Sequence, residues 1–237
     1  MNRIPAWPRT ILKRARVAIS AGLLVLLAGA CQINQDGPPE PAPPAPVAFP
    51  YPPFEIRTDV AVPLQPPLVD AARFALQVTV DRRLSNDPDE RELYERYRSQ
   101  IAPEIDNPGI RIPDIYVGQT GGALQRAVAA RELPDGAIEV SICLYDTPGL
   151  YAMKKDGELV KPPGGSDGLW RPKVKWTAQK AAVGPAPTTP RWLLMNSGVL
   201  LDITEQEISA VCGPFRPDPF IQRPPEPTAA TPTAMPC

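Results

Sequence analysis

The residues of this chain whose types and positions point to chemistry are its four cysteines, Cys31, Cys143, Cys212 and Cys237. The chain contains no histidine. That absence removes the commonest general base, the commonest zinc ligand, and every dyad in which histidine activates a serine or a cysteine. The sequence therefore indicates modification or oxidation of thiols, and the segment around each cysteine decides which of the two applies.

Cys31 follows a segment typical of an export signal. Residues 1–30 carry five basic side chains and no acidic one, and they end in an apolar run of 14 residues, Val17–Ala30. A run of that length is short for a bilayer span and fits the apolar region of a signal peptide. The small residues 28–30, directly before Cys31, resemble the lipobox of bacterial lipoproteins.

This resemblance implies that residues 1–30 are a signal peptide and that the chain is cut before Cys31, whose thiol is acylated. Two or three acyl chains anchor a protein firmly, whereas one chain binds only marginally. We therefore expect palmitate-type chains on Cys31 and a location on the extracytoplasmic face of the cell membrane. The alternative is a plain signal peptide beside an incidental cysteine, which would give a secreted protein.

The charge of the processed chain excludes one class of partner. The full sequence has 25 basic and 26 acidic residues, and removal of residues 1–30 takes away five basic residues and no acidic one. The remaining 20 basic and 26 acidic residues make the exported protein acidic. Binding to nucleic acid would require a basic face. We therefore expect no nucleic acid partner, and we expect the acyl anchor to provide the membrane contact.

The remaining three cysteines predict one disulfide. Outside the cytoplasm two of them are expected to pair. Cys143 and Cys212 are the expected pair, because both lie in sequence typical of a folded domain, while Cys237 ends a proline-rich tail. A disulfide between them would close a loop of about 70 residues and stabilise the domain by roughly 4 kcal/mol. The alternative is two buried free thiols. Cys237 would then be a terminal thiol or a covalent link to a partner.

Proline content divides the chain. Residues 31–66 contain eleven prolines and predict a stiff, extended linker with no packed element. Residues 214–237 repeat that composition and predict a disordered tail. Residues 67–213 have the size of one domain with a proper core.

Two helices are predicted at the start of that domain. Apolar residues recur at helical spacing from Leu68 to Thr79, with Asp70 placed in the first turn. A second helix follows over 87–101, with a cap at Asn86 or Asp87, and ends at Pro103. We interpret the acids at its start as complementing the helix dipole rather than holding calcium, and we expect no metal or cofactor.

Extended segments are predicted after these helices. The turn formers 134–136 separate two runs, and in the second, 138–144, apolar residues alternate with Glu139, Ser141 and Cys143. That alternation places Cys143 on the face opposite the apolar one. Asp156-Gly157 predicts a hairpin. Other segments are expected as follows: a loop at 118–125 that leads into a strand, long strands at 169–184 and 191–203, and a short helix at 203–213 capped by Thr204.

The order of helices and then strands predicts an α+β fold, with N-terminal helices packed on one face of a curved antiparallel sheet. The segment from about 66 to 212 has a strand ending in "SICLYD", a "KKDGEL" hairpin and two later strands that carry tryptophans. With these features it resembles actinobacterial lipoproteins with a fold like nuclear transport factor two. That fold, also called cystatin-like, is a cone whose open end can hold an apolar ligand.

Some relatives with this fold use a buried aspartate as general base and a tyrosine as a hydrogen-bond donor. The resemblance therefore implies a candidate pocket here. Its residues would be Asp146, Tyr145, Tyr94, Tyr97, Trp176 and Trp192. The alternative role for Asp146 is a turn residue before Thr147-Pro148-Gly149 that accepts backbone amides. For the two tryptophans, the alternative is burial in the sheet.

Together these observations predict a lipid-anchored, extracytoplasmic, non-catalytic domain. It would bind either a protein partner in the cell envelope or a small apolar ligand. The alternative is an isomerase- or dehydratase-type enzyme that uses the Asp/Tyr pocket. Because a fold does not imply a function, the choice depends on whether those side chains converge.

Overall fold

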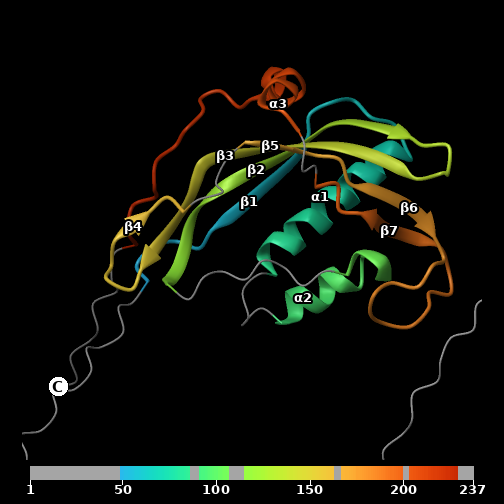
Figure 1. The fold of residues 1–237 in the computed structure, drawn as a ribbon, viewed down its shortest axis with the longest axis horizontal. Coiled ribbons are helices and arrows are strands. Elements are labelled where there is room, and N and C mark those ends of the chain that lie inside the picture. The colour runs from blue at the N-terminus through green and yellow to red at the C-terminus, as the bar shows by residue number, and fades with distance from the viewer. Residues whose placement is uncertain (1–48, 86–90, 107–114, 163–166, 200–202, 229–237) are drawn as a thin grey trace, which may run out of the picture. The chain divides into compact units, whose positions relative to one another are not determined.

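The computed structural model describes residues 49–85, 91–106, 115–162, 167–199 and 203–228 (Figure 1). They form an α+β fold with three α-helices and a mixed, open sheet of seven strands. The cysteines Cys31 and Cys237, the segment 1–30, and the cap residues Asn86 and Asp87 lie outside the described residues.

The first helix, α1 (Leu68–Leu84), begins after Pro67 and carries Asp70 in its first turn and basic residues in its last. These charges complement the helix dipole. Its sheet-facing side is built mainly from small residues, including Ala71, Ala72 and Ala75, which are fully buried. Small side chains let a helix lie close to the strands that it covers, and α1 contacts five of them, namely β1, β2, β3, β6 and β7.

A buried carboxylate joins α1 to α2 (Arg91–Arg98). Asp81 has no exposed surface. It accepts hydrogen bonds from Gln77, from Arg96 at 2.5 and 3.1 Å, and from Gln100 at 2.8 Å. Removing a partner from such a buried charge is costly, so these bonds fix α2 against α1. A short 3₁₀ helix, η1 (Pro103–Ile105), follows.

The sheet is dominated by a long hairpin of β2 (Tyr116–Glu132) and β3 (Ile138–Lys154). The predicted turn lies between them, where Gly136 adopts a φ of 75° that favours glycine. The remaining strands are β1 (Glu55–Val60), β4 (Leu159–Val160), β5 (Gly168–Trp170), β6 (Lys173–Thr177) and β7 (Arg191–Asn196). The main path runs β1-β2-β3-β6-β7, with β4 and β5 also paired to β3.

Strand β1 corrects two expectations. It lies inside 31–66, so the expectation of a linker with no packed element does not hold for residues 55–60. It also precedes the helices and pairs with β2 in parallel, which makes the sheet mixed rather than wholly antiparallel. The alternating sequence EIRTDV is compatible with a strand that has one face on a core.

Other corrections concern strand lengths. Residues 118–125, expected to form a loop, belong to β2. The two long strands expected at 169–184 and 191–203 are instead the short β5, β6 and β7. Pro172 lies between β5 and β6, and its backbone has no amide to donate to a ladder. The predicted hairpin at Asp156-Gly157 is confirmed, because it joins β3 to β4.

The two faces of the sheet carry different helices. On one face, which we call the α1 face, α1 covers an apolar cluster that includes Val140 and Ile142 of β3. On the other, the α3 face, α3 (Glu205–Cys212) covers a smaller cluster that includes Cys143 and Tyr145. Figure 1 shows α1 and α2 on one side of the sheet and α3 on the opposite side. The predicted alternation along β3, with Cys143 opposite the apolar face, is confirmed.

Residues 214–228 also differ from the disordered tail expected for 214–237, of which 229–237 lie outside the described residues. A 3₁₀ helix, η2 (Gly213–Phe215), continues from α3. The chain then packs back on the sheet as far as Thr228, whose backbone amide donates to the carbonyl oxygen of Pro50 at 2.7 Å. We call residues 216–228 the strap. Separately, no described helix is both long enough and apolar enough to span a bilayer.

Candidate functional site

The predicted pocket residues Tyr145 and Asp146 do not face one another. They are consecutive on β3, and successive side chains of a strand point to opposite faces. Tyr145 is buried on the α3 face, where its hydroxyl donates to the carbonyl oxygen of Cys212 at 2.6 Å. Burial raises the pKa of Tyr145 to about 12. The Tyr145 hydroxyl therefore keeps its proton and its structural hydrogen bond to Cys212.

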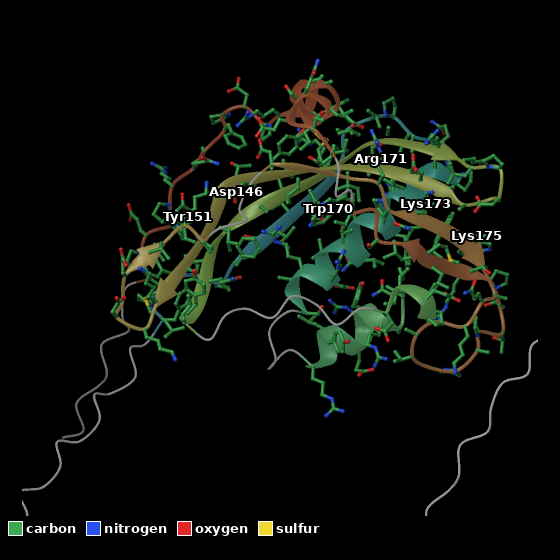
Figure 2. The ribbon with its side chains drawn as sticks, in the orientation of Figure 1. Asp146, Tyr151, Trp170, Arg171, Lys173 and Lys175 are labelled. Carbon is green, nitrogen blue, oxygen red and sulfur yellow. A yellow bond between two sulfur atoms is a disulfide. The ribbon has the colours of Figure 1, made fainter. Side chains whose placement is uncertain are left out.

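Asp146 is also committed to structural contacts. Its side chain is almost fully buried; Oδ1 accepts the amide of Leu150 at 2.9 Å, and Oδ2 lies 2.8 Å from Nζ of Lys161. The hydrogen bond to Asp146 raises the pKa of Lys161. The expectation that this carboxylate accepts a backbone amide is confirmed, although the residue lies within β3 rather than in a turn. Figure 2 shows Asp146 on β3, with Tyr151 farther along the same strand.

The tyrosines of α2 lie elsewhere. Tyr97 is buried in the cluster beneath α1, and burial raises its pKa. Tyr94 is half-buried, with the guanidinium of Arg98 5.6 Å from its ring centre. Among the described residues, no hydrogen bond joins either hydroxyl to Asp146. The acid and the donors of the predicted pocket therefore do not form one catalytic set.

The tryptophans form a separate pair at the end of the sheet. Trp176 of β6 and Trp192 of β7 are cross-strand partners with ring centres 5.4 Å apart in an edge-on arrangement. Trp192 packs partly against the α1-face cluster, whereas Trp176 is 56% exposed. Trp192 is thus partly buried against the core, whereas Trp176 is available for contacts at the surface.

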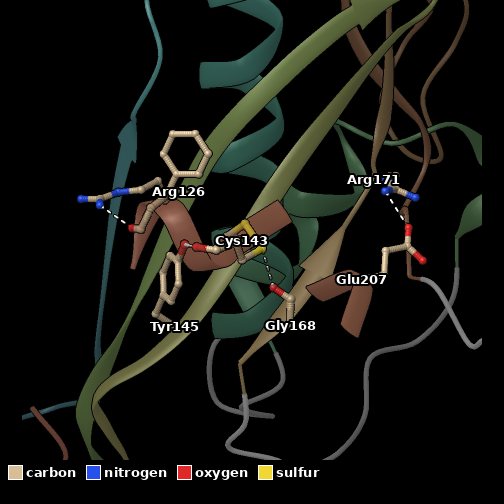
Figure 3. The surroundings of a disulfide bond; sticks show 8 residues. Arg126, Cys143, Tyr145, Gly168, Arg171 and Glu207 are labelled. Atoms are coloured by element: carbon tan, nitrogen blue, oxygen red, sulfur yellow. Dashed lines mark hydrogen bonds and ion pairs between the residues drawn. A yellow bond between two sulfur atoms is a disulfide. The ribbon is translucent and has the colours of Figure 1, made fainter. Parts of the chain in front are cut away.

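The α3 face is held together by the predicted disulfide. Cys143 and Cys212 are bonded across 69 residues of sequence, and both are buried (Figure 3). At the start of α3, the Oγ1 of Thr204 accepts the amide of Glu207 at 3.2 Å, as the capping pattern predicts. The carboxylate of Glu207 accepts a hydrogen bond from Nη2 of Arg171 at 2.8 Å. The disulfide, the Arg171–Glu207 contact and the hydrogen bond from Tyr145 to Cys212 therefore place α3 on the sheet, and the cap fixes the start of the helix.

The strap follows η2, and one contact to Phe215 at the end of η2 and one from Gln222 within the strap hold it in place. Nη1 of Arg126 donates to the carbonyl oxygen of Phe215 at 2.8 Å, while the other guanidinium nitrogens of Arg126 bind Asp59 of β1 at 2.7 and 2.6 Å. Farther along, Nε2 of Gln222 donates to the carbonyl oxygen of Asp146 at 3.2 Å. The strap thus crosses the α3 face between two fixed points.

A groove of about 500 Å³ lies between this strap and β1. Its lining comes from four segments of the chain: Glu55 and Arg57 of β1; Gly121 and Gly122 of β2; Thr147 and Pro148 of β3; and Pro217, Asp218, Pro219 and Ile221 of the strap. The volume is within the range of known ligand sites. This groove is the candidate functional site.

Two glycines let the strands meet beneath the groove. A Cβ on Gly121 would lie 2.0 Å from the carbonyl oxygen of Gly149, and one on Gly122 would lie 2.7 Å from that of Glu55. Both distances are far below ordinary contact. The register between β2 and β3 also shifts between Gly122 and Leu124. The glycines therefore permit a close, irregular junction of three strands, which forms the floor of the groove.

The charges in the groove favour a polar or mixed ligand. Glu55 and Arg57 are exposed and point to the same face, because they are two residues apart on one strand. Asp218 faces them from the strap. Within the described ranges, no ion pair involves any of these three side chains. The groove therefore offers one cation and two anions beside apolar proline rings and Ile221.

Sequence reasoning missed this groove because it placed both of its walls outside the domain. The alternation in residues 55–60 is typical of a strand, but the proline density of 31–66 argued against any packed element there. Nothing in the sequence of the strap indicates that it packs on the sheet. In the part of the chain that the structure describes, no cluster of three carboxylate or thiol side chains could hold a metal ion.

Comparison of the chain with protein-family models, with curated proteins and with solved structures gives no significant match. The functional conclusion therefore depends on the residues and contacts described above.

Proposed function

We propose that this protein is a lipid-anchored, extracytoplasmic, non-catalytic domain that binds a protein partner of the cell envelope. The observation that carries the proposal is the groove on the α3 face. It is walled by a strap that a disulfide and several hydrogen bonds hold in place. Such a preorganised surface suits recognition, because little ordering free energy remains to be lost on binding.

The anchor and the location are supported by two independent features. The first is the lipobox-like sequence before Cys31, preceded by a basic and then an apolar segment. The second is the Cys143–Cys212 disulfide, since such bonds persist mainly in oxidising compartments. Acylation of Cys31 would hold the domain at the extracytoplasmic side of the membrane.

A binding role is favoured over an isomerase or dehydratase by the contacts of the predicted acid and donors. A general base must lie within reach of the proton that it removes. Asp146 instead faces Lys161 and a backbone amide, and the hydroxyl of Tyr145 is bonded to Cys212 on the other face of the sheet. Both side chains therefore make structural contacts rather than forming a catalytic pair.

For the fold we propose a variant of the cystatin-like cone. What supports it is the placement of α1 and α2 on one face of a sheet dominated by the long β2–β3 hairpin. The parallel edge strand β1 is a departure from that pattern. The apolar face beneath α1 is filled by buried side chains such as Leu76 and Ile142. Such filling favours a protein partner over a small apolar ligand in the cone.

The composition of the groove also favours a protein partner over a small apolar ligand. Pockets for small apolar ligands are lined mainly by hydrophobic and aromatic side chains. This groove instead combines Glu55, Arg57 and Asp218 with prolines. A polypeptide can match both kinds of surface at once, with charged side chains at the rim and an apolar one against Ile221.

The test is site-specific photo-crosslinking in cells. A photoreactive residue is placed at Ile221, in the groove, and at Ile115, an exposed isoleucine that does not line it, as the matched control. A third position, Trp176, probes the exposed aromatic end of the sheet. We expect a defined protein adduct at Ile221 and none at Ile115.

An adduct at Trp176 alone would overturn the groove as the binding site. No adduct at all, together with extra native mass on the protein extracted from membranes, would replace the protein partner by a small ligand.

The same mass measurement tests the anchor. We expect a chain that begins at Cys31, carries acyl chains and gains two hydrogens on reduction, and an unlipidated chain would overturn the anchor.

A further inference from the structure

Strand β1 leaves one edge of the sheet open. It is the terminal strand of the main path and, among the described residues, pairs only with β2. The amide of Ala61 donates to Ala127, so the odd-numbered residues of β1 direct their backbone groups toward β2. Because bonding alternates along a strand, the amides and carbonyls of Ile56 and Thr58 point away from the sheet. Among the described residues, no hydrogen bond ends on either amide.

An open edge is a template for another strand. The side chains next to it decide which strand fits. Glu55 and Arg57 are both exposed, lie on the α3 face and have no ion-pair partner among the described residues. They carry opposite charges at positions i and i+2. A strand that places a cation opposite Glu55 and an anion opposite Arg57 would neutralise both.

We propose that this strand is β1 of a second copy of the chain. Two copies of β1 that pair antiparallel about a two-fold axis at Ile56 place each Glu55 opposite Arg57 of the other copy. An antiparallel two-fold pairing keeps the same face of both sheets on the same side, so the two ion pairs form together. The dimer joins two seven-stranded sheets into one continuous sheet.

Backbone geometry limits the pairing to registers that use even-numbered residues, and the charges then select this one. Antiparallel strands exchange hydrogen bonds at alternate residues. With Ile56 opposite Ile56, the bonded pairs are even-numbered residues, which are the residues whose amides point outward. A register centred on Thr58 would also use even residues, but it would place Arg57 opposite Asp59. Asp59 already accepts two hydrogen bonds from Arg126, so the Ile56 register is the one that leaves existing contacts intact.

This inference goes beyond the proposed function, because it concerns the free edge of β1, although the dimer would share Glu55 and Arg57 with the groove. The interface consists mainly of one short strand from each copy, so we expect reversible association. If the acyl anchor is present, it confines both copies to one membrane and raises their effective concentration. The dimer is therefore best tested in membranes.

The first test is cysteine crosslinking of the full chain in membranes, with Cys237→Ser as the parent. Ile56→Cys puts two thiols across the axis, where the Cα atoms of a bonded antiparallel pair are about 5.5 Å apart, within disulfide range. Thr58→Cys is the matched control, since the two thiols would be roughly 13 Å apart along the strands. We expect a reducible dimer for Ile56→Cys only.

The second test is charge reversal, which needs no new cysteine. Glu55→Arg or Arg57→Glu alone places like charges across the axis and should weaken the dimer roughly tenfold. The double variant Glu55→Arg/Arg57→Glu restores opposite charges and should restore the dimer. Both residues are exposed, so an intact Cys143–Cys212 disulfide and an unchanged melting temperature serve as the folding control.

Three outcomes would overturn the dimer. The first is no crosslink at Ile56→Cys in a folded chain, and the second is a stronger crosslink at Thr58→Cys, which would mean the other register. The third is a double charge reversal that binds no better than the single ones. Ile56 and Thr58 do not line the groove, so the two cysteine results do not depend on crosslinking at Ile221, and the dimer and the proposed partner site can fail separately.

Discussion

On the α1 face of the sheet, thirteen buried side chains form one apolar cluster under α1, with contributions from both ends of the domain. On the α3 face, six buried side chains form a smaller cluster that includes the disulfide. Helix α1 buries seven residues along its length, whereas Cys212 is the one buried residue of α3. The first face is held by packing, and the second by a covalent bond, a helix cap and hydrogen bonds to the strap.

This difference explains where a binding surface can form. A face closed by close packing leaves no room for a ligand. A face closed at a few fixed points leaves space between them, and the groove lies between the strap and β1. Stability on one side of the sheet therefore permits an open, polar arrangement on the other. The comparison can be tested by weakening each face separately.

The largest effect is expected from the α1 face. Ile142→Ala removes a side chain that has no exposed surface and should lower the free energy of unfolding by about 3–4 kcal/mol through lost burial and a cavity. Urea unfolding measures the change. Val117→Ala, at an exposed position of β2, is the control and should change stability by less than about 0.5 kcal/mol. A loss at Ile142 as small as that of the control would contradict the packing of this face.

A somewhat smaller and more local effect is expected from the neighbouring residue on the other face. Replacing both Cys143 and Cys212 with alanine should lower the free energy of unfolding by about 2–4 kcal/mol. Hydrogen exchange should show faster opening of α3 and the strap, while amides of α1 exchange only through global unfolding. Equal loss of protection in α1 and α3 would show that the two faces are one cooperative unit.

The α1 face is also the part that could be predicted from the sequence. Helical spacing from Leu68 onward and strict alternation from Ile138 to Cys143 each indicate a buried face, and both predictions are confirmed. On the α3 face, the Cys143–Cys212 pair followed from the composition around each cysteine. These patterns are local, because each depends on residues a few positions apart.

The groove could not be predicted in the same way. Its walls come from β1 and the strap, which are more than 150 residues apart in sequence and lie within proline-rich segments. Proline density argued against packed structure there, but contacts such as that of Arg126 with Asp59 and Phe215 override that local preference. Similarly, Gly121 and Gly122 indicated a loop, whereas the structure uses them where three strands approach closely.

The next effect concerns pH on the α3 face. Burial raises the pKa of Tyr145 to about 12 in the folded protein, while an unfolded tyrosine titrates near 10. Between these values the unfolded chain releases the proton first, so the stability present below about pH 10 should fall by about 1.4 kcal/mol per pH unit as pH rises.

Urea unfolding at several pH values, compared between the natural chain and Tyr145→Phe, isolates this contribution from those of lysines and other tyrosines. The difference between the two proteins should be constant below about pH 10 and should shrink above it. Parallel curves across the whole range would contradict the raised pKa that burial gives the Tyr145 hydroxyl.

The smallest effect is expected from the cap of α3, and it sharpens the contrast between the helices. The N-cap residue of α1 is Pro67, which makes no side-chain cap, whereas the Oγ1 of Thr204 accepts the amide of Glu207 in α3. Thr204→Ala should cost about 1 kcal/mol, and Thr204→Ser should cost little because serine caps equally well. Because α3 has little buried surface, the loss should appear as faster hydrogen exchange in its first turn and in the strap. If Thr204→Ala and Thr204→Ser behave alike, packing rather than capping fixes this end of α3, and the two faces differ less than their contacts indicate.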